Sequence, residues 1–307
     1  MGIEENDKRN LERIREAGVT WVRLDVKEPM QSTVDVFKEA HRLDLKVIAV
    51  VLSKKMLRGL GFPAGHYLPG SDWKRKWKER VSEAAGELGP YVDIWQVDNE
   101  LNHPWHNLLP SMNLKLAVEI VDAGAEAIRE RCPHAETAAN VFFERKVPFS
   151  CCGIDIFRDE RFILSYKEKL RDAIDILGMD IYRSTWHGKT PQNYPSDLER
   201  YHGLWGGDVM IMETGFCTGF LGGSEADQAS YVHQVFDSLD HHIRHVPWFR
   251  GAVWYKFKSK DAGLPCEGFF GLRRGDGSEE KEAWGKFVER IGQYNRYNKI
   301  LGIMYHW

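Results

Sequence analysis

The sequence predicts a single α/β domain that forms a closed barrel of parallel strands. Short, almost continuous apolar segments alternate along the chain with segments of helical periodicity. Apolar runs of this kind are typical of parallel strands buried on both faces, and their alternation with helices favours right-handed crossovers. The chain has 307 residues, a common length for one barrel, and no break in composition divides it. We therefore expect residues 1–307 to form one catalytic (β/α)8 TIM-barrel domain.

The expected strands are rich in β-branched and aromatic residues and are bounded by turn residues. They are Val19–Val26, Lys46–Leu52, Val92–Val97, Thr137–Phe143, Ile174–Tyr182, Asp208–Gly215 and Gly251–Phe257.

The expected helices carry their apolar residues on one stripe. They are Lys8–Ala17, Thr33–Leu43, Trp73–Leu88, Ser111–Cys132, Phe162–Ala173, Ser196–Trp205, Ser224–Leu239 and Glu279–Tyr294. Gly18 follows the first helix as a C-cap, and Ser71 or Asp72 can cap the third.

These seven strands leave a closed barrel one strand short. The apolar segment 299–307, KILGIMYHW, follows the last helix and can supply the eighth. On this hypothesis the tail is the first barrel strand in space, and the chain is circularly permuted relative to a usual barrel. The alternative is a surface strand or a frayed tail.

The composition excludes several classes of partner. A net charge of −3 indicates no nucleic-acid partner, and no apolar run is long enough to span a membrane. The acidic start, MGIEENDKRN, does not resemble a signal peptide, although a trimmed secreted precursor stays open. Five cysteines without a CxxC pair argue against a disulfide scaffold and favour a cytoplasmic location.

Two of the predicted strands end in a carboxylate beside small polar residues. The first reads VDIWQVDNE and ends at Glu100; the second reads DVMIMETG and contains Glu213. Barrel enzymes place their catalytic groups at the carboxyl ends of strands. We therefore expect Glu100 and Glu213 to face each other across the barrel mouth.

The order of motifs at successive strand ends resembles clan A of the glycoside hydrolases over most of the chain. The matching segments are Trp21-Val22-Arg23-Leu24-Asp25, Asp98-Asn99-Glu100, Asp180-Ile181-Tyr182, Glu213-Thr214-Gly215 and Val253-Trp254-Tyr255. Further matches are Phe269-Phe270-Gly271-Leu272, Asp276-Gly277-Ser278 and Lys281-Glu282-Ala283, where Glu282 stands in place of the clan's proline.

The resemblance implies a retaining β-glycosidase with Glu100 as acid/base and Glu213 as nucleophile. It further implies that Asn99 binds the sugar 2-hydroxyl and that Tyr182 and Arg23 hold the nucleophile.

Aromatic residues complete the expected site. The resemblance implies that the ring of Trp254 forms the floor of a sugar subsite. Trp105 and Trp186, on loops at the carboxyl side of strands, are candidates to stack on sugars. His306 and Trp307 would lie near the mouth if the tail is the first strand.

The hydrolysis of a glycoside explains why two glutamates are needed. Cleaving an acetal needs a proton on the leaving oxygen and a nucleophile at the anomeric carbon, which two carboxyl groups about 5 Å apart provide. One must stay ionised, and the other must carry a proton at the start and lose it later. No cofactor or metal is implied.

Several residues have a second interpretation. Arg23 could pair with Asp25, Tyr182 could be a core aromatic, and Asp98 could be a second acid or a buried structural partner. His241 and His245 are four residues apart and could bind zinc, but no third ligand is evident.

Two other functions stay open: a carbohydrate-binding barrel without turnover, and a metal-dependent hydrolase that uses His103, His106 and nearby acids. The abundance of tryptophan suits polysaccharide degradation, and a small glycoside is an equally compatible substrate.

Overall fold

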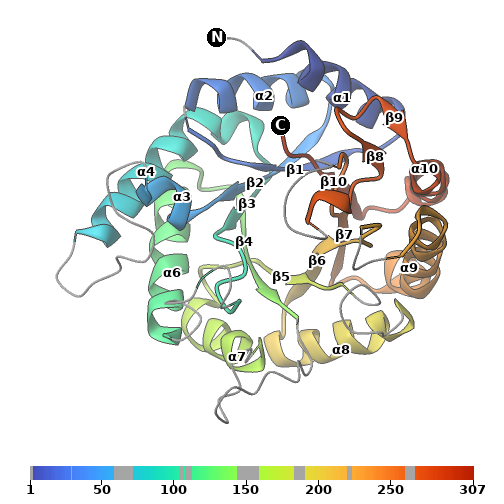
Figure 1. The fold of residues 1–307 in the computed structure, drawn as a ribbon. Helices are drawn as coiled ribbons and strands as arrows, with labels where there is room; N and C mark the ends of the chain where they lie inside the picture. The colour runs from blue at the N-terminus through green and yellow to red at the C-terminus, as the bar shows by residue number, and fades with distance from the viewer. Residues whose placement is uncertain are drawn as a thin grey trace.

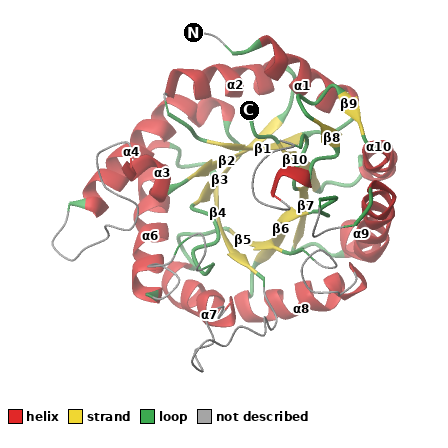
Figure 2. Cartoon of the chain, viewed as in Figure 1, coloured by secondary structure: helices red, strands yellow, loops and turns green. Residues whose placement is uncertain are grey.

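The chain folds into a closed barrel of eight parallel strands surrounded by helices, as Figures 1 and 2 show. The computed structural model describes residues 3–28, 30–58, 72–103, 107, 113–143, 159–182, 191–219, 223–259 and 267–307. The barrel strands are β1 (Trp21–Asp25), β2 (Lys46–Val51), β3 (Ile94–Val97), β4 (Glu136–Phe142), β5 (Ile176–Asp180), β6 (Asp208–Thr214), β7 (Phe249–Trp254) and β10 (Ile300–Met304). The predicted fold class is confirmed.

The eighth strand is β10, which lies between β1 and β7 and closes the ring. It pairs with β1 through Trp21↔Gly302 and with β7 through Ile300↔Gly251, parallel on both sides. Gly251 has φ +140°, and a Cβ there would lie 1.9 Å from the carbonyl oxygen of Ile300. Glycine is therefore required where these backbones approach. The predicted role of the tail in the sheet is confirmed, whereas circular permutation stays a prediction.

Helices between consecutive strands form the outer layer (Figure 1). The longer ones are α1 (Glu5–Glu16), α2 (Met30–Arg42), α4 (Trp73–Leu88), α6 (Leu114–Arg131), α7 (Asp159–Leu170), α8 (Tyr194–Trp205), α9 (Glu225–His245) and α10 (Glu282–Tyr294). Each buries an apolar stripe against the barrel because its apolar residues recur every three or four positions. The capping box of Ser224 and Asp227 fixes the start of α9.

Two apolar layers hold the barrel together. The inner layer fills the barrel with residues that include Ile48, Ile94, Ile176 and Met210, all fully buried. The outer layer packs the opposite faces of the strands against the helices. Both faces of each strand are therefore buried, which explains their nearly continuous apolar sequences.

Some boundaries differ from the predictions. A short helix, α3 (Ser53–Arg58), follows β2, and α9 continues to His245. Glu279 and Glu280 form β9 (Glu279–Glu280), which pairs with β8 (Arg273–Arg274), so the last helix begins at Glu282. Asp72 precedes α4 without a side-chain capping bond.

Cys217 is disulfide-bonded, and its partner lies outside the described residues. The predicted cytoplasmic location stays a prediction. Of the helices in the described ranges, none has the length and apolar character needed to cross a bilayer.

Candidate active site

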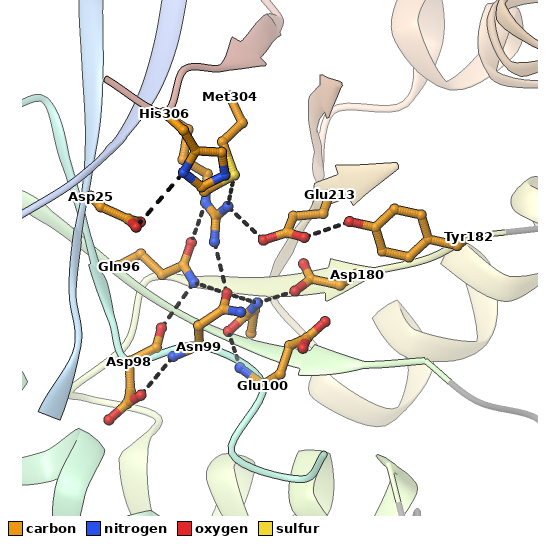
Figure 3. A network of polar contacts seen from close by, with 12 residues as sticks. Asp25, Gln96, Asp98, Asn99, Glu100, Asp180, Tyr182, Glu213, Met304 and His306 are labelled. Atoms are coloured by element: carbon orange, nitrogen blue, oxygen red, sulfur yellow. Dashed lines mark hydrogen bonds and ion pairs between the residues drawn. The ribbon is translucent and has the colours of Figure 1, made fainter. Parts of the chain in front are cut away.

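The two predicted glutamates meet at the carboxyl end of the barrel, together with Asp180. Glu100 follows β3, Glu213 lies near the end of β6, and Asp180 ends β5. One carboxylate oxygen from each residue lies within 4.8 Å of those of the other two, and Glu100 and Glu213 are only 3% and 6% exposed. Figure 3 shows Asp180 between the two glutamates.

Both oxygens of Glu213 accept a hydrogen bond from a fixed donor. Arg23 Nη1 donates to Oε1 at 2.7 Å, and the Tyr182 hydroxyl donates to Oε2 at 2.5 Å. Burial, with the charge of Glu213 next, raises the pKa of Tyr182 well above its usual range, so the hydroxyl keeps its proton. The two donors, one of which is the cation Arg23, fix both oxygens of the Glu213 carboxyl group.

Arg23 is fully buried inside the barrel, and each of its three guanidinium nitrogens donates a hydrogen bond. Nε donates to Gln96 Oε1 at 2.8 Å, and Nη2 donates to Asn99 Oδ1 at 2.8 Å. Met304 Sδ lies 2.9 Å from Nη1. Burial acts to lower the pKa of Arg23, but the charges of Glu213, Asp180 and Asp25 raise it above its ordinary value. Of the two interpretations of Arg23, the ion pair with Glu213 is the one observed.

Asn99 is held by three donors at a single atom. Its Oδ1 accepts from Arg23, from Gln96 Nε2 at 3.0 Å and from Asn140 Nδ2 at 2.8 Å. Asn140 also accepts at Oδ1 from the backbone N–H of Glu100, at 3.0 Å. One amide on β4 therefore fixes both Asn99 and Glu100.

Asp180 is fully buried and was not among the predicted site residues. Its Oδ2 accepts a hydrogen bond from Asn140 Nδ2 at 2.5 Å. Burial first, then the charges of Glu213 and Glu100, raise the pKa of Asp180 well above its usual range. The signal in the sequence was an acidic residue at the end of an apolar strand, the same signal that selected Glu213.

Asp98 points away from this cluster and supports the backbone. It accepts from the Ser53 hydroxyl, from the Ser53 N–H at 3.2 Å and from the Asn99 N–H at 2.9 Å. Burial raises its pKa. Asp98 and Glu100 have positive φ, +62° and +49°, a conformation that non-glycine residues rarely adopt. Asp98 is therefore the buried structural partner, one of the two roles considered for it.

The residues after β10 reach the same end of the barrel. His306 Nδ1 lies 3.9 Å from Asp25 Oδ2, which also pairs with Lys55 at 2.9 Å. Burial acts to raise the pKa of Asp25, but the charges of His306 and Lys55 outweigh it and lower the pKa. The Lys27 ammonium lies 4.0 Å from the centre of the Trp307 ring. The predicted position of His306 and Trp307 agrees with the structure.

Trp254 requires a correction. It is 2% exposed and contacts Tyr231 of α9 and Phe287 of α10, so its ring faces the helix layer rather than the barrel mouth. Its neighbour Tyr255 points the other way and contacts Tyr182, with ring centroids 6.0 Å apart. Adjacent residues of a strand point to opposite faces, so an error of one residue reverses the prediction.

Three predicted residues, Trp105, Trp186 and His106, lie outside the described residues. His103 packs edge-on against Phe142. The rings of His241 and His245 on α9 lie 5.4 Å apart. Across the described ranges, the group of three or more potential metal ligands is that of Glu100, Asp180 and Glu213, and the histidine pair belongs to none.

The three carboxylates are close enough to share a metal cation, but the positively charged side chain of Arg23 already lies beside them. Arg23 and Tyr182 occupy both oxygens of Glu213. A metal ion bound there would compete with these donors for Glu213 and would be repelled by the Arg23 charge. We therefore identify no metal ligands in this cluster.

Comparisons with known proteins support the fold. No family model and no curated protein matches the sequence. Among solved structures, the chain is similar to the beta-glycosidase BGL167, with a TM-score of 0.69, 13% identity, and coverage of 94% of this chain and 86% of that one. It is similar to the AHE enzyme from Alicyclobacillus herbarius, with a TM-score of 0.70, 12% identity, and coverage of 95% and 86%.

A beta-galactosidase from the psychrophilic Marinomonas ef1 is also similar, with a TM-score of 0.68 and 14% identity over 95% of this chain and 57% of that one. TM-scores of 0.68–0.70 at identities of 12–14% show a shared barrel fold and nothing finer. A shared barrel does not by itself imply a shared reaction, so the function is argued from the site.

Proposed function

We propose that the protein is a retaining glycoside hydrolase that cleaves a β-linked glycoside or polysaccharide by double displacement. The observation that carries the proposal is the separation of Glu100 and Glu213, whose nearest oxygens lie within 4.8 Å. Retaining enzymes hold their carboxyl groups about 5–5.5 Å apart, and inverting enzymes about 6.5–9.5 Å, to leave room for a water. Oxygens that approach within 4.8 Å suit the shorter of these spacings, at which a carboxylate can attack directly.

Glu213 is the proposed nucleophile. Its oxygens are oriented by Arg23 and Tyr182, and both donors favour the ionised form. Its attack on the anomeric carbon forms a glycosyl ester and breaks the bond to the leaving oxygen.

Glu100 is the proposed acid/base. It gives its proton to the leaving oxygen and afterwards takes a proton from the water that hydrolyses the ester. The Asn99 oxygen is fully used by protein donors, so its amide N–H groups are what it can offer to the sugar 2-hydroxyl. Tyr255, His306 and Trp307 are proposed to line the sugar subsite in place of Trp254.

The test is turnover of a panel of aryl β-glycosides and β-linked oligosaccharides by wild type, Glu213→Gln and Glu100→Gln. We expect Glu213→Gln to lose activity on every substrate. Glu100→Gln should lose most activity on substrates with poor leaving groups and least on activated aryl glycosides, which need no proton. A 2-deoxy-2-fluoro glycoside should label Glu213, as identified by peptide mass spectrometry.

Three outcomes would contradict the proposal. Full activity of Glu213→Gln would remove the nucleophile. Loss of activity with a chelator would favour the metal-dependent hydrolase. A wild type that binds sugars without turnover or labelling would favour the binding-only barrel.

A further inference from the structure

The site holds three buried carboxyl groups where the reaction uses two. Glu100, Asp180 and Glu213 lie within 4.8 Å of one another through their oxygens. Three charges so close in a buried setting would repel strongly, so their ionisation must be shared out. Among the described residues, the cation that hydrogen-bonds to this cluster is Arg23.

The hydrogen bonds decide which carboxyl group is ionised. Glu213 accepts from Arg23 and Tyr182, one donor for each oxygen. Asp180 accepts from Asn140 at Oδ2, and no described group hydrogen-bonds to its Oδ1. An ionised aspartate would leave Oδ1 buried and unsatisfied, whereas a protonated one can place its O–H there as a donor.

Charge balance agrees with this assignment. With Glu213 ionised and Arg23 protonated, the cluster is neutral when Glu100 and Asp180 both hold a proton. After the glycosyl ester forms, Glu213 is neutral, and Glu100 has given its proton to the leaving group. The single negative charge has moved to Glu100, beside Asp180, and Arg23 still balances it.

We propose that Asp180 is a permanently protonated third acid, which donates its Oδ1 hydroxyl to Glu100 and stabilises the Glu100 carboxylate in the covalent intermediate. It acts through Glu100 and does not touch the sugar. A buried carboxylic acid kept neutral by its surroundings can serve as such a donor. The groups that face Asp180 are Glu100, Glu213, Arg23, Tyr182 and Asn140, and its raised pKa agrees with the role.

The experiment compares Asp180→Asn, which keeps a neutral donor, with Asp180→Leu, which has similar bulk and no donor. The assay is kcat/KM on a β-linked oligosaccharide with a poor leaving group, because formation of the glycosyl-enzyme then develops on Glu100 the negative charge that the Asp180 hydroxyl stabilises. We expect Asp180→Asn to stay within about 5-fold of wild type and Asp180→Leu to fall about 10- to 100-fold, the range for a lost hydrogen bond to a charged group. Asp208→Asn, on the same strand as Glu213 but at the opposite end of the barrel, is the charge control.

A pH profile distinguishes this role from packing. If Asp180 is neutral in wild type, the basic limb of kcat/KM in Asp180→Asn should coincide with that of wild type. If Asp180 were ionised, removing its charge would ease the loss of the Glu100 proton, and the basic limb would move to lower pH by about one unit or more. That shift, or equal rates for the two Asp180 variants, would overturn the inference.

A second measurement does not depend on activity or on folding of the leucine variant. In protein labelled with ¹³C at the aspartate carboxyl, the Asp180 signal is identified by its absence in Asp180→Asn. We expect this signal to show a protonated carboxyl group from pH 5 to 8, whereas an ordinary aspartate titrates at about pH 4. A carboxylate signal at pH 7 would refute the assignment. The inference rests on the proposed function, but the two can fail independently. A wild type without activity would refute the glycosidase, whereas an ionised Asp180 in an active enzyme would refute only the inference.

Discussion

Substituting Arg23→Met would remove the cation of the site and leave its partners buried. Arg23 bonds to Glu213 Oε1 at 2.7 Å, and its other nitrogens donate to Gln96 and Asn99. Removing one partner of a buried ion pair costs about 3–5 kcal/mol. Asn99 keeps two other donors to its oxygen, so the loss there is small. We expect the free energy of unfolding to fall by about 4 kcal/mol, a large part of the about 5–15 kcal/mol typical of a native protein.

Urea denaturation at pH 7 measures this loss, and tryptophan fluorescence suits the assay because the chain has 11 tryptophans. Activity gives an independent readout. Arg23 Nη1 holds Glu213 Oε1 at 2.7 Å, so without it the carboxylate loses one of its two fixed donors, and kcat/KM should fall about 10- to 100-fold. Arg23→Lys is the matched control: it keeps a charge but not the planar fork, and should lose less than half as much stability.

A double-mutant cycle with Glu213→Gln isolates the pair. Each single variant leaves the other residue buried without its ion partner, so the two losses should not add, with a coupling energy of about 2 kcal/mol. The reasoning is refuted if Arg23→Met costs less than about 1 kcal/mol and its kcat/KM matches that of wild type.

Three further substitutions have defined outcomes. Tyr182→Phe removes one donor to Glu213 and should lower kcat/KM about 10- to 100-fold with little change in Tm; an unchanged rate would contradict its role. If the native state holds a proton on Asp180 as proposed, the unfolded state loses that proton above about pH 4, so the stability of wild type relative to Asp180→Asn should fall as pH rises from 4 to 7 and become constant below pH 4. A difference independent of pH over this range, in urea unfolding at several pH values, would be inconsistent with this linkage. Gly251→Ala would place a Cβ 1.9 Å from a carbonyl oxygen of β10, so this variant should already be unfolded at the start of a thermal melt. Gly86→Ala, in open space on α4, should instead raise the free energy of unfolding by about 0.5–1 kcal/mol. Similar melting of the two variants would refute the role of Gly251.

Much of the fold could be predicted because the determining patterns are local. Continuous apolar runs select buried parallel strands, and 3.6-residue periodicity selects the helices. Even β10 was predictable, since a seven-strand count left the barrel one strand short and Ile300–Met304 has the composition of a strand. The β8–β9 hairpin was missed because each of its strands has only two residues, too few for a period.

The site was predictable only in part, because its contacts join residues far apart in the chain. Sequence alone could not choose between Asp25 and Glu213 as the partner of Arg23, since that depends on how strands across the barrel align. Gln96 and Asn140 were missed because a polar residue in an apolar strand has no distinguishing pattern until its neighbours are known. Only the barrel brings these amides beside Arg23 and Asn99.

The position of β10 affects how the barrel can close while the chain is being synthesised. All other barrel strands precede β10 in the chain, so during synthesis β1 and β7 emerge with unpaired edges, which are prone to aggregate. Met304, on the same late strand, contacts Arg23, which pairs with Glu213. A nascent chain stopped before residue 300 would carry both glutamates but could neither close the ring nor complete the setting of Arg23. The complete setting of Arg23 would therefore form only after Ile300–Met304 has emerged and joined the two edges.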